Sequence, residues 1–144
     1  PEIYEVLVGH AHFLLQERSL SHVILVDACK RDIVMVPPGY GHVTINAGDS
    51  DLVMANIVST VFESEYGEYE KRRGASYYEL ADGTFIKNPA YPPVPDLQLI
   101  KAGEVRQKLP LDDGGIYELI GTDHLTFLNY PENTPDLFRE VLKG

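Results

Sequence analysis

Short apolar segments separated by turn-forming residues are the feature that most constrains the fold of this chain. The segments are four to seven residues long, and Gly, Pro, Asn, Asp and Ser gather between them. Segments of this length suit β-strands better than helices, and turns at this spacing are typical of sandwiches and barrels. The sequence therefore predicts an all-β sandwich or barrel built from residues 2–8, 10–16, 22–26, 33–36, 42–47 and 52–58.

The first of these segments places a carboxylate beside a phenol. Side chains on a strand alternate between its two faces, so Glu2 and Tyr4 point one way while Ile3 and Glu5 point the other. Glu2 and Tyr4 would then face the same cavity and could act together there. A strand glutamate beside a packing tyrosine is the alternative.

A second segment, residues 37–46, joins a tight turn to a histidine. Pro37 and Pro38 end the preceding apolar segment, Gly39 permits the reversal, and His42 begins the next strand. A histidine at the lip of a strand pair can present a ring nitrogen to a cavity, where metal ligands are found. A hydrogen-bonded surface histidine is the alternative.

Together these two segments resemble the cupin family. Its first motif ends in a glutamate, six residues and a glycine, which Glu2 and Gly9 match. Its second motif has a proline, a glycine two residues later, a histidine after two more residues, and an asparagine four residues beyond the histidine. The residues that match it in order and spacing are Pro37, Gly39, His42 and Asn46.

A narrower resemblance covers about residues 1–89. The sequences Pro-Glu-Ile-Tyr-Glu-Val-Leu at 1–7, Phe-Leu-Leu-Gln at 13–16, Val-Pro-Pro at 36–38 and Glu-Tyr-Gly at 65–67 are similar to the archaeal cupin-type glucose-6-phosphate isomerases. The resemblance implies a cupin barrel, that is, a double-stranded β-helix of the jelly-roll type. It also implies a metal-dependent interconversion of glucose 6-phosphate and fructose 6-phosphate by a homodimer.

The resemblance also implies the site residues. Glu2 and His42 would be metal ligands, and Glu2 would also carry the proton, unless the reaction proceeds by a hydride shift. Tyr4 and Tyr66 would bind the sugar or its phosphate. The metal would be divalent, with iron, manganese, nickel and zinc not distinguished.

In that family two histidines one residue apart precede the glutamate. This sequence begins at Pro1, so we expect those histidines to lie upstream in an N-terminal segment that this sequence lacks. His10 and His12 offer another pair on one strand face. They follow Gly9, however, and the opposite face, with Ala11, Phe13 and Leu15, is better suited to a barrel interior.

Some positions depart from the better-matching members of the family. Val58 and Ser64 stand where those members carry a tyrosine and a histidine, and the basic residues 71–73 suit either a phosphate or an ordinary exposed surface. These departures leave open a sugar-binding cupin without catalysis. Another metal cupin enzyme, such as an epimerase or a dioxygenase, is a further alternative.

Composition sets the remaining limits. A chain of 144 residues with 44% hydrophobic content suits a single domain over residues 1–144, with residues 90–144 as an extension packed on the barrel. The formal net charge of −10 argues against nucleic acid and anionic membranes as partners. Cys29 is the only cysteine, which excludes an intrachain disulfide, and no apolar segment is long enough to span a membrane. A cytoplasmic location is expected.

In the second half of the sequence, turn-forming residues mark the boundaries of the predicted elements. Asp82-Gly83 predicts a hairpin between residues 77–80 and 84–87, and the proline-rich residues 88–96 predict an extended connector. Residues 62–74 are predicted to be a polar loop. Further strands are predicted at 97–100, 115–120 and 125–130, followed by a terminal helix at 134–144.

Overall fold

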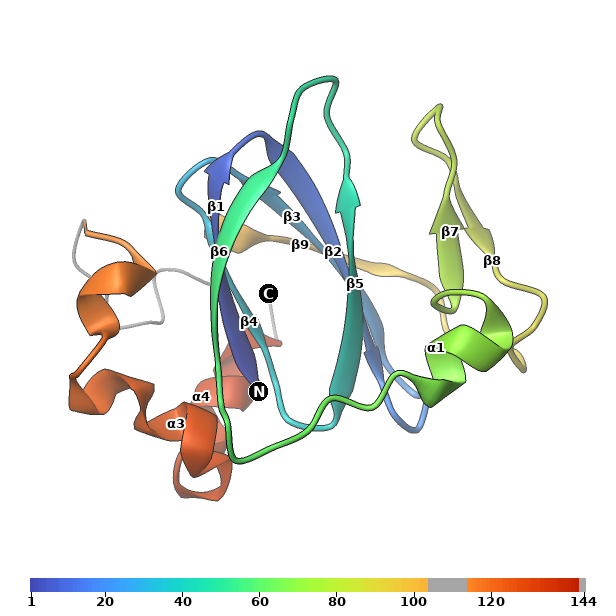
Figure 1. Ribbon diagram of the computed structural model, residues 1–144. Coiled ribbons are helices and arrows are strands. Elements are labelled where there is room, and N and C mark those ends of the chain that lie inside the picture. The colour runs from blue at the N-terminus through green and yellow to red at the C-terminus, as the bar shows by residue number, and fades with distance from the viewer. Residues whose placement is uncertain (104–113, 143–144) are drawn as a thin grey trace.

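The strands of the computed structural model form two facing sheets that enclose a common core (Figure 1). The structure describes residues 1–103 and 114–142. One sheet has the strand order β4-β1-β6 and the other the order β5-β2-β3-β9. Their bounds are β1 (Glu2–Val8), β2 (His10–Glu17), β3 (Val23–Cys29), β4 (Ile33–Val36), β5 (Tyr40–Asn46), β6 (Val53–Val58) and β9 (Gln98–Lys101).

Alternation along the strands explains which side chains fill the core. On β2, Ala11, Phe13 and Leu15 are almost fully buried, whereas His10 and His12 lie on the other face and are partly exposed. This arrangement confirms the prediction that the apolar face of residues 10–16 lines the interior. The all-β, cupin-like fold is likewise confirmed.

The backbone conformation explains why glycine occupies both motif positions, Gly9 and Gly39. Gly9 has a φ of +90°, and a Cβ placed on it would lie 2.5 Å from the carbonyl oxygen of Asp51. Gly39 has a φ of +79° in the turn that leads into β5. Other residues adopt such dihedral angles only with strain, so these glycines allow the strand reversals on which the site depends.

A second layer covers the outer face of the four-stranded sheet. It contains α1 (Gly67–Arg72) and the hairpin of β7 (Tyr77–Glu79) and β8 (Phe85–Lys87). A separate buried cluster joins this layer to the sheet; it comprises Leu14, Val23, Leu25, Ala75, Tyr77, Tyr91 and Val94. The hairpin prediction is confirmed.

The prediction of a loop over residues 62–74 is wrong in part, because α1 occupies its second half. An ion pair between Glu68 and Arg72, with Oε2 and Nε 2.9 Å apart, spans one helical turn and stabilises it. The helix ends at Arg72, and the next residue, Arg73, adopts a left-handed conformation with φ of 58°.

The C-terminal residues form short helical segments that lie beside the three-stranded sheet and at the lower end of the barrel in Figure 1. Their apolar side chains, among them Ile116, Phe127 and Phe138, join the same core as Ile3 of β1. The segments are η1 (Ile116–Leu119), η2 (Asp123–Leu125), α3 (Thr126–Asn129), η3 (Pro131–Asn133) and α4 (Pro135–Val141).

The strands predicted at 115–120 and 125–130 are therefore wrong. Ile116 and Leu119 are three residues apart and are both buried, which is the spacing of a helical turn and not of a strand. The strand predicted at 97–100 is confirmed by β9, which pairs in parallel with β3. The terminal helix is confirmed by α4, while residues 143–144 lie outside the described part. Within the described residues, no helix has the length and apolar character needed to cross a membrane.

Candidate functional site

Strand pairing brings together three of the predicted site residues, Glu2, Tyr4 and His42, in the barrel interior. His42 on β5 is paired with Leu15 of β2, whose side chain is buried in the core, so the histidine faces inward. The ring of Tyr4 on β1 packs against Phe13, with ring centroids 5.3 Å apart, and meets the His42 ring edge-on at 5.2 Å. Glu2 lies two residues before Tyr4 on the same face of β1, as the alternation predicted.

These side chains form a directed series of hydrogen bonds. The Tyr4 hydroxyl donates to Oε2 of Glu2 at 2.6 Å, and Nε2 of His42 lies 3.0 Å from the Tyr4 oxygen. A phenol has one hydroxyl proton, and Tyr4 uses it in the hydrogen bond to Glu2. His42 must therefore be the donor in the second hydrogen bond. The order of donation is therefore His42 to Tyr4 to Glu2.

Burial controls the protonation states in this series. The side chains of His42 and Glu2 are only 17% and 22% exposed. Burial lowers the pKa of His42, and the nearby Glu2 carboxylate opposes part of that effect. Burial also raises the pKa of Tyr4 well above its usual range, helped by the hydrogen bond to Glu2. At neutral pH His42 is therefore uncharged and Tyr4 keeps its proton.

The carboxylate and the imidazole are also close enough to share a ligand. Oε2 of Glu2 and Nε2 of His42 lie 4.0 Å apart. Two ligands of one divalent ion, each about 2.0–2.2 Å from it, can be separated by about this distance or less. The donor set of one oxygen and one nitrogen is compatible with iron, manganese, nickel or zinc.

Tyr66 lies outside this hydrogen-bonded group. It immediately precedes α1 and is 65% exposed, although its phenol is near enough to contribute a small part of the rise in the pKa of Tyr4. Val58, cross-strand from Glu2, is 48% exposed. Tyr66 therefore lies near the Tyr4 hydroxyl but is largely open to solvent, the position of a residue at the rim of a site.

Asn56 is a residue of this site that the sequence reasoning missed. It lies opposite Tyr4 in the pairing of β1 with β6, and its side-chain hydrogen bond lowers the pKa of Tyr4 against the effect of burial. The signal in the sequence was a single polar residue inside the apolar segment 52–58. Its relation to Tyr4 depends on the strand register.

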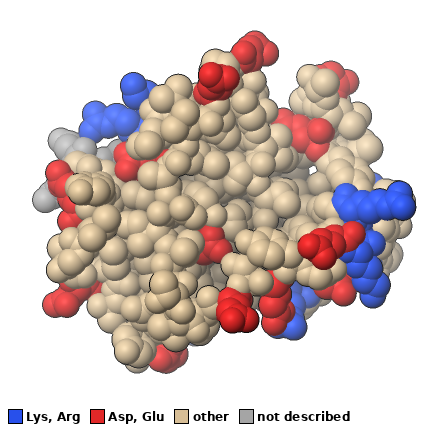
Figure 2. Space-filling view, viewed as in Figure 1, with Lys and Arg blue, Asp and Glu red and all other residues tan. Residues whose placement is uncertain are grey.

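The basic residues of α1 have different surroundings. The guanidinium of Arg72 bonds Glu68 and the carbonyl oxygen of Ala90, and it lies 4.6 Å from the centroid of the Tyr91 ring. Arg72 therefore fastens α1 to the connector. The Lys71 side chain is 74% exposed and lies 3.8 Å from the Glu68 carboxylate. Figure 2 shows basic side chains gathered at the α1 end of this face.

The comparison with protein families gives one match. The model of the family described as Glucose-6-phosphate isomerase (GPI) matches residues 1–96, which include Glu2, Tyr4, His42 and Tyr66. No curated protein matches the chain. The match extends over two thirds of the sequence, from β1 to the end of the proline-rich connector. The chain therefore belongs to the cupin-type glucose-6-phosphate isomerase family and is an isomerase.

Proposed function

We propose that the chain interconverts glucose 6-phosphate and fructose 6-phosphate inside the barrel, with a divalent metal ion and with Glu2, Tyr4 and His42 at the reacting carbons. The observation that carries this proposal is the series of hydrogen bonds from His42 through Tyr4 to Glu2 in the interior. A soluble homodimer of the cytoplasm is the assembly and location that the family resemblance supports.

Isomerisation moves a hydrogen between C1 and C2 of the sugar. In the proton-transfer route, Glu2 removes the proton from C2 as a general base and returns it to C1, while negative charge collects on the oxygens of the enediol. Proton transfer between the two oxygens completes the exchange. In a hydride shift, by contrast, the hydrogen passes directly between the carbons and Glu2 serves only as a ligand.

Glu2 and His42 are the residues of this chain that would hold the metal ion. Ligation through Nε2 uses the lone pair of His42, so the ring proton must then reside on Nδ1 and the bond to Tyr4 is given up. When bound, a divalent ion supplies positive charge opposite the substrate oxygens. Once His42 no longer donates to it, the Tyr4 oxygen can accept a hydrogen bond from a substrate hydroxyl.

Tyr4 and Tyr66 are proposed to bind the substrate. Tyr4 remains protonated because burial raises its pKa, so it can hold the Glu2 carboxylate in place or donate to a sugar oxygen. Tyr66 at the rim would contact the phosphate end, near the exposed Lys71. The departures at Val58 and Ser64 support a weaker alternative, a protein that binds the sugar phosphate without turnover.

The proposal is tested by measuring the rate of glucose 6-phosphate isomerisation before and after a chelator removes bound metal ions. The rate is then measured again after Mn²⁺, Fe²⁺, Ni²⁺ or Zn²⁺ is added back. We expect chelation to abolish turnover and one of these ions to restore it. Glu2→Gln should lower kcat by roughly 10²–10⁴-fold, as expected for loss of a general base. His124→Gln, which changes an exposed histidine of η2, is the matched control.

Carrying out the reaction in D₂O separates the two chemical routes. Proton transfer exchanges solvent deuterium into the product, which proton NMR detects, whereas a hydride shift retains the substrate hydrogen. Binding of the sugar phosphate without turnover at any metal would contradict the isomerase proposal and favour the binding protein.

A further inference from the structure

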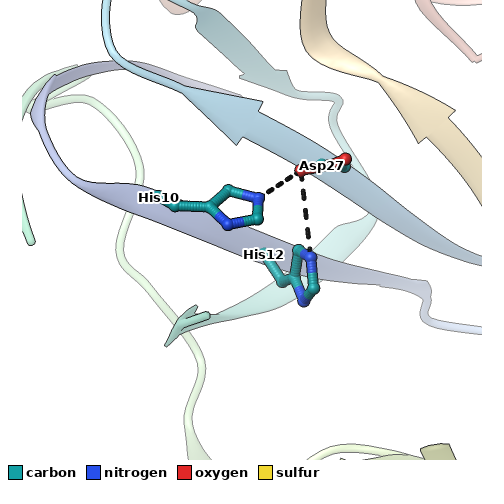
Figure 3. A group of neighbouring side chains, drawn as sticks. All are labelled: His10, His12 and Asp27. Atoms are coloured by element: carbon teal, nitrogen blue, oxygen red, sulfur yellow. Dashed lines mark hydrogen bonds and ion pairs between the residues drawn. The ribbon is translucent and has the colours of Figure 1, made fainter. Parts of the chain in front are cut away.

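A second group of metal-ligand side chains lies on the outer face of the barrel, beside the β7–β8 hairpin. His10 and His12 come from β2, and the strand register pairs His12 with Asp27 of β3. Figure 3 shows both rings directed at the same carboxylate oxygen. Nε2 of His10 lies 2.5 Å from Oδ1 of Asp27, and Nε2 of His12 lies 3.8 Å from it. One potential ligand atom from each residue lies within 4.8 Å of the other two.

Glu79 of β7 fixes the orientation of His12. Its Oε2 lies 2.8 Å from Nδ1 of His12, and its side chain is only 9% exposed. A carboxylate accepts hydrogen bonds, so Nδ1 of the neutral ring carries the proton and the lone pair of Nε2 is directed toward Asp27. Metal-binding histidines are commonly held in this way by a carboxylate on the other ring nitrogen.

A cation can be held between these groups. Nε2 of His12, with the ring proton on Nδ1 beside Glu79, turns its lone pair toward the Asp27 oxygen, so an ion between the two atoms would be attracted to both. Nε2 of His10 carries the proton of its 2.5 Å hydrogen bond to Asp27, and this bond is given up and the two atoms move apart when Nε2 becomes a ligand. The separation of 3.8 Å is close to the roughly 3.4 Å expected between two ligands of a tetrahedral zinc ion with bonds of about 2.0–2.2 Å.

We propose that His10, His12 and Asp27 bind one Zn²⁺ ion, with Glu79 as the positioning residue. Two imidazole nitrogens and a carboxylate oxygen are a donor set that zinc prefers, and three protein ligands leave a fourth position for water. This site is distinct from Glu2 and His42, because the side chains of β2 alternate between the two faces of the sheet. The ion would also fasten the β7–β8 hairpin to the barrel through Glu79.

The test uses the full chain carrying Glu2→Gln and His42→Gln, which removes both donors of the interior. Isothermal titration with Zn²⁺ should give one bound ion, and Co²⁺ should give the absorption of a four-coordinate site. Adding either His12→Gln or Asp27→Asn should abolish binding, and adding His124→Gln should leave it unchanged. Circular dichroism identifies any variant that fails to fold, in which case the other variant decides.

The role of Glu79 has its own readout. Glu79→Ala should weaken zinc binding by about 10–100-fold, the range found when an outer carboxylate is removed. Glu79→Gln retains an accepting oxygen and should restore much of the affinity. The proposal would be overturned if the protein carrying only Glu2→Gln and His42→Gln bound no zinc. Unchanged zinc binding after His12→Gln or Asp27→Asn is added, in protein that remains folded, would overturn it as well.

Discussion

Tyr4 occupies the central position in the candidate site because it contacts both proposed ligands. It donates to Glu2 and accepts from His42, so each neighbour restricts the rotation of the phenol. Asn56 approaches the same hydroxyl from β6. When His42 binds the metal and gives up its bond to Tyr4, Glu2 and Asn56 still position the hydroxyl. The contribution of the hydroxyl can be separated from metal binding because Tyr4 is not one of the proposed ligands.

Tyr4→Phe should lower activity without removing the metal. The ring still packs on Phe13, but the charged hydrogen bond to Glu2 is lost, and such bonds contribute about 1.5–3 kcal/mol. If this free energy stabilises the transition state, its loss should lower kcat/KM by roughly 10–150-fold. Steady-state kinetics and metal analysis of the same sample measure the two effects. An unchanged kcat/KM would show that the hydroxyl has no part in the reaction.

At the scale of elements, the contact between β5 and α1 links the barrel interior to the rim. Gly41 faces outward next to the inward-facing His42, and a Cβ on Gly41 would collide with the Tyr69 ring of α1. The absence of a side chain at Gly41 thus lets α1 approach the strand. Because Tyr66 lies three residues before Tyr69, the same contact sets the position of Tyr66.

Gly41→Ala should destabilise the protein by about 1–3 kcal/mol, the usual cost of overpacking. Tyr69→Phe is the matched comparison, since its buried hydroxyl has no hydrogen-bond partner among the described residues. Removing that hydroxyl should leave stability unchanged or raise it. Urea unfolding measures both variants. Equal stability of Gly41→Ala and the parent would show that α1 moves away without cost.

The elements of the first half could be predicted from sequence because their pattern is local. Strand alternation places Glu2 with Tyr4, and the turn at Gly39 places His42 at the start of β5. Asn56 could not be placed in the same way, because its position depends on the register between β1 and β6. Asp27 and Glu79 reach His12 through a strand pairing and the docking of a hairpin, which periodicity does not encode.

At the scale of the whole molecule, the barrel is covered on both sides by later parts of the chain. Residues 67–97 pack on the four-stranded sheet. Residues 114–142 pack beside the three-stranded sheet, and Leu142 at their end also reaches Ile24 and Ile100 of the four-stranded sheet. The second cover also has a specific polar contact. The backbone N–H of Ile116, at the start of η1, donates to Oε2 of Glu5 at 2.9 Å. Glu5 lies on the face of β1 opposite Glu2 and Tyr4, so this contact supports the fold from outside the site.

Glu5→Ala should therefore loosen the C-terminal cover without altering the chemistry. Loss of a hydrogen bond to a charged acceptor is expected to cost about 1.5–3 kcal/mol, and local opening should expose residues 114–142 to limited proteolysis. Glu5→Gln keeps an accepting oxygen and should be cleaved more slowly than Glu5→Ala. Both variants should retain the parental kcat/KM at temperatures where they stay folded. Equal cleavage rates for the two variants would mean that apolar packing alone, centred on Ile3 and Ile116, holds the cover in place.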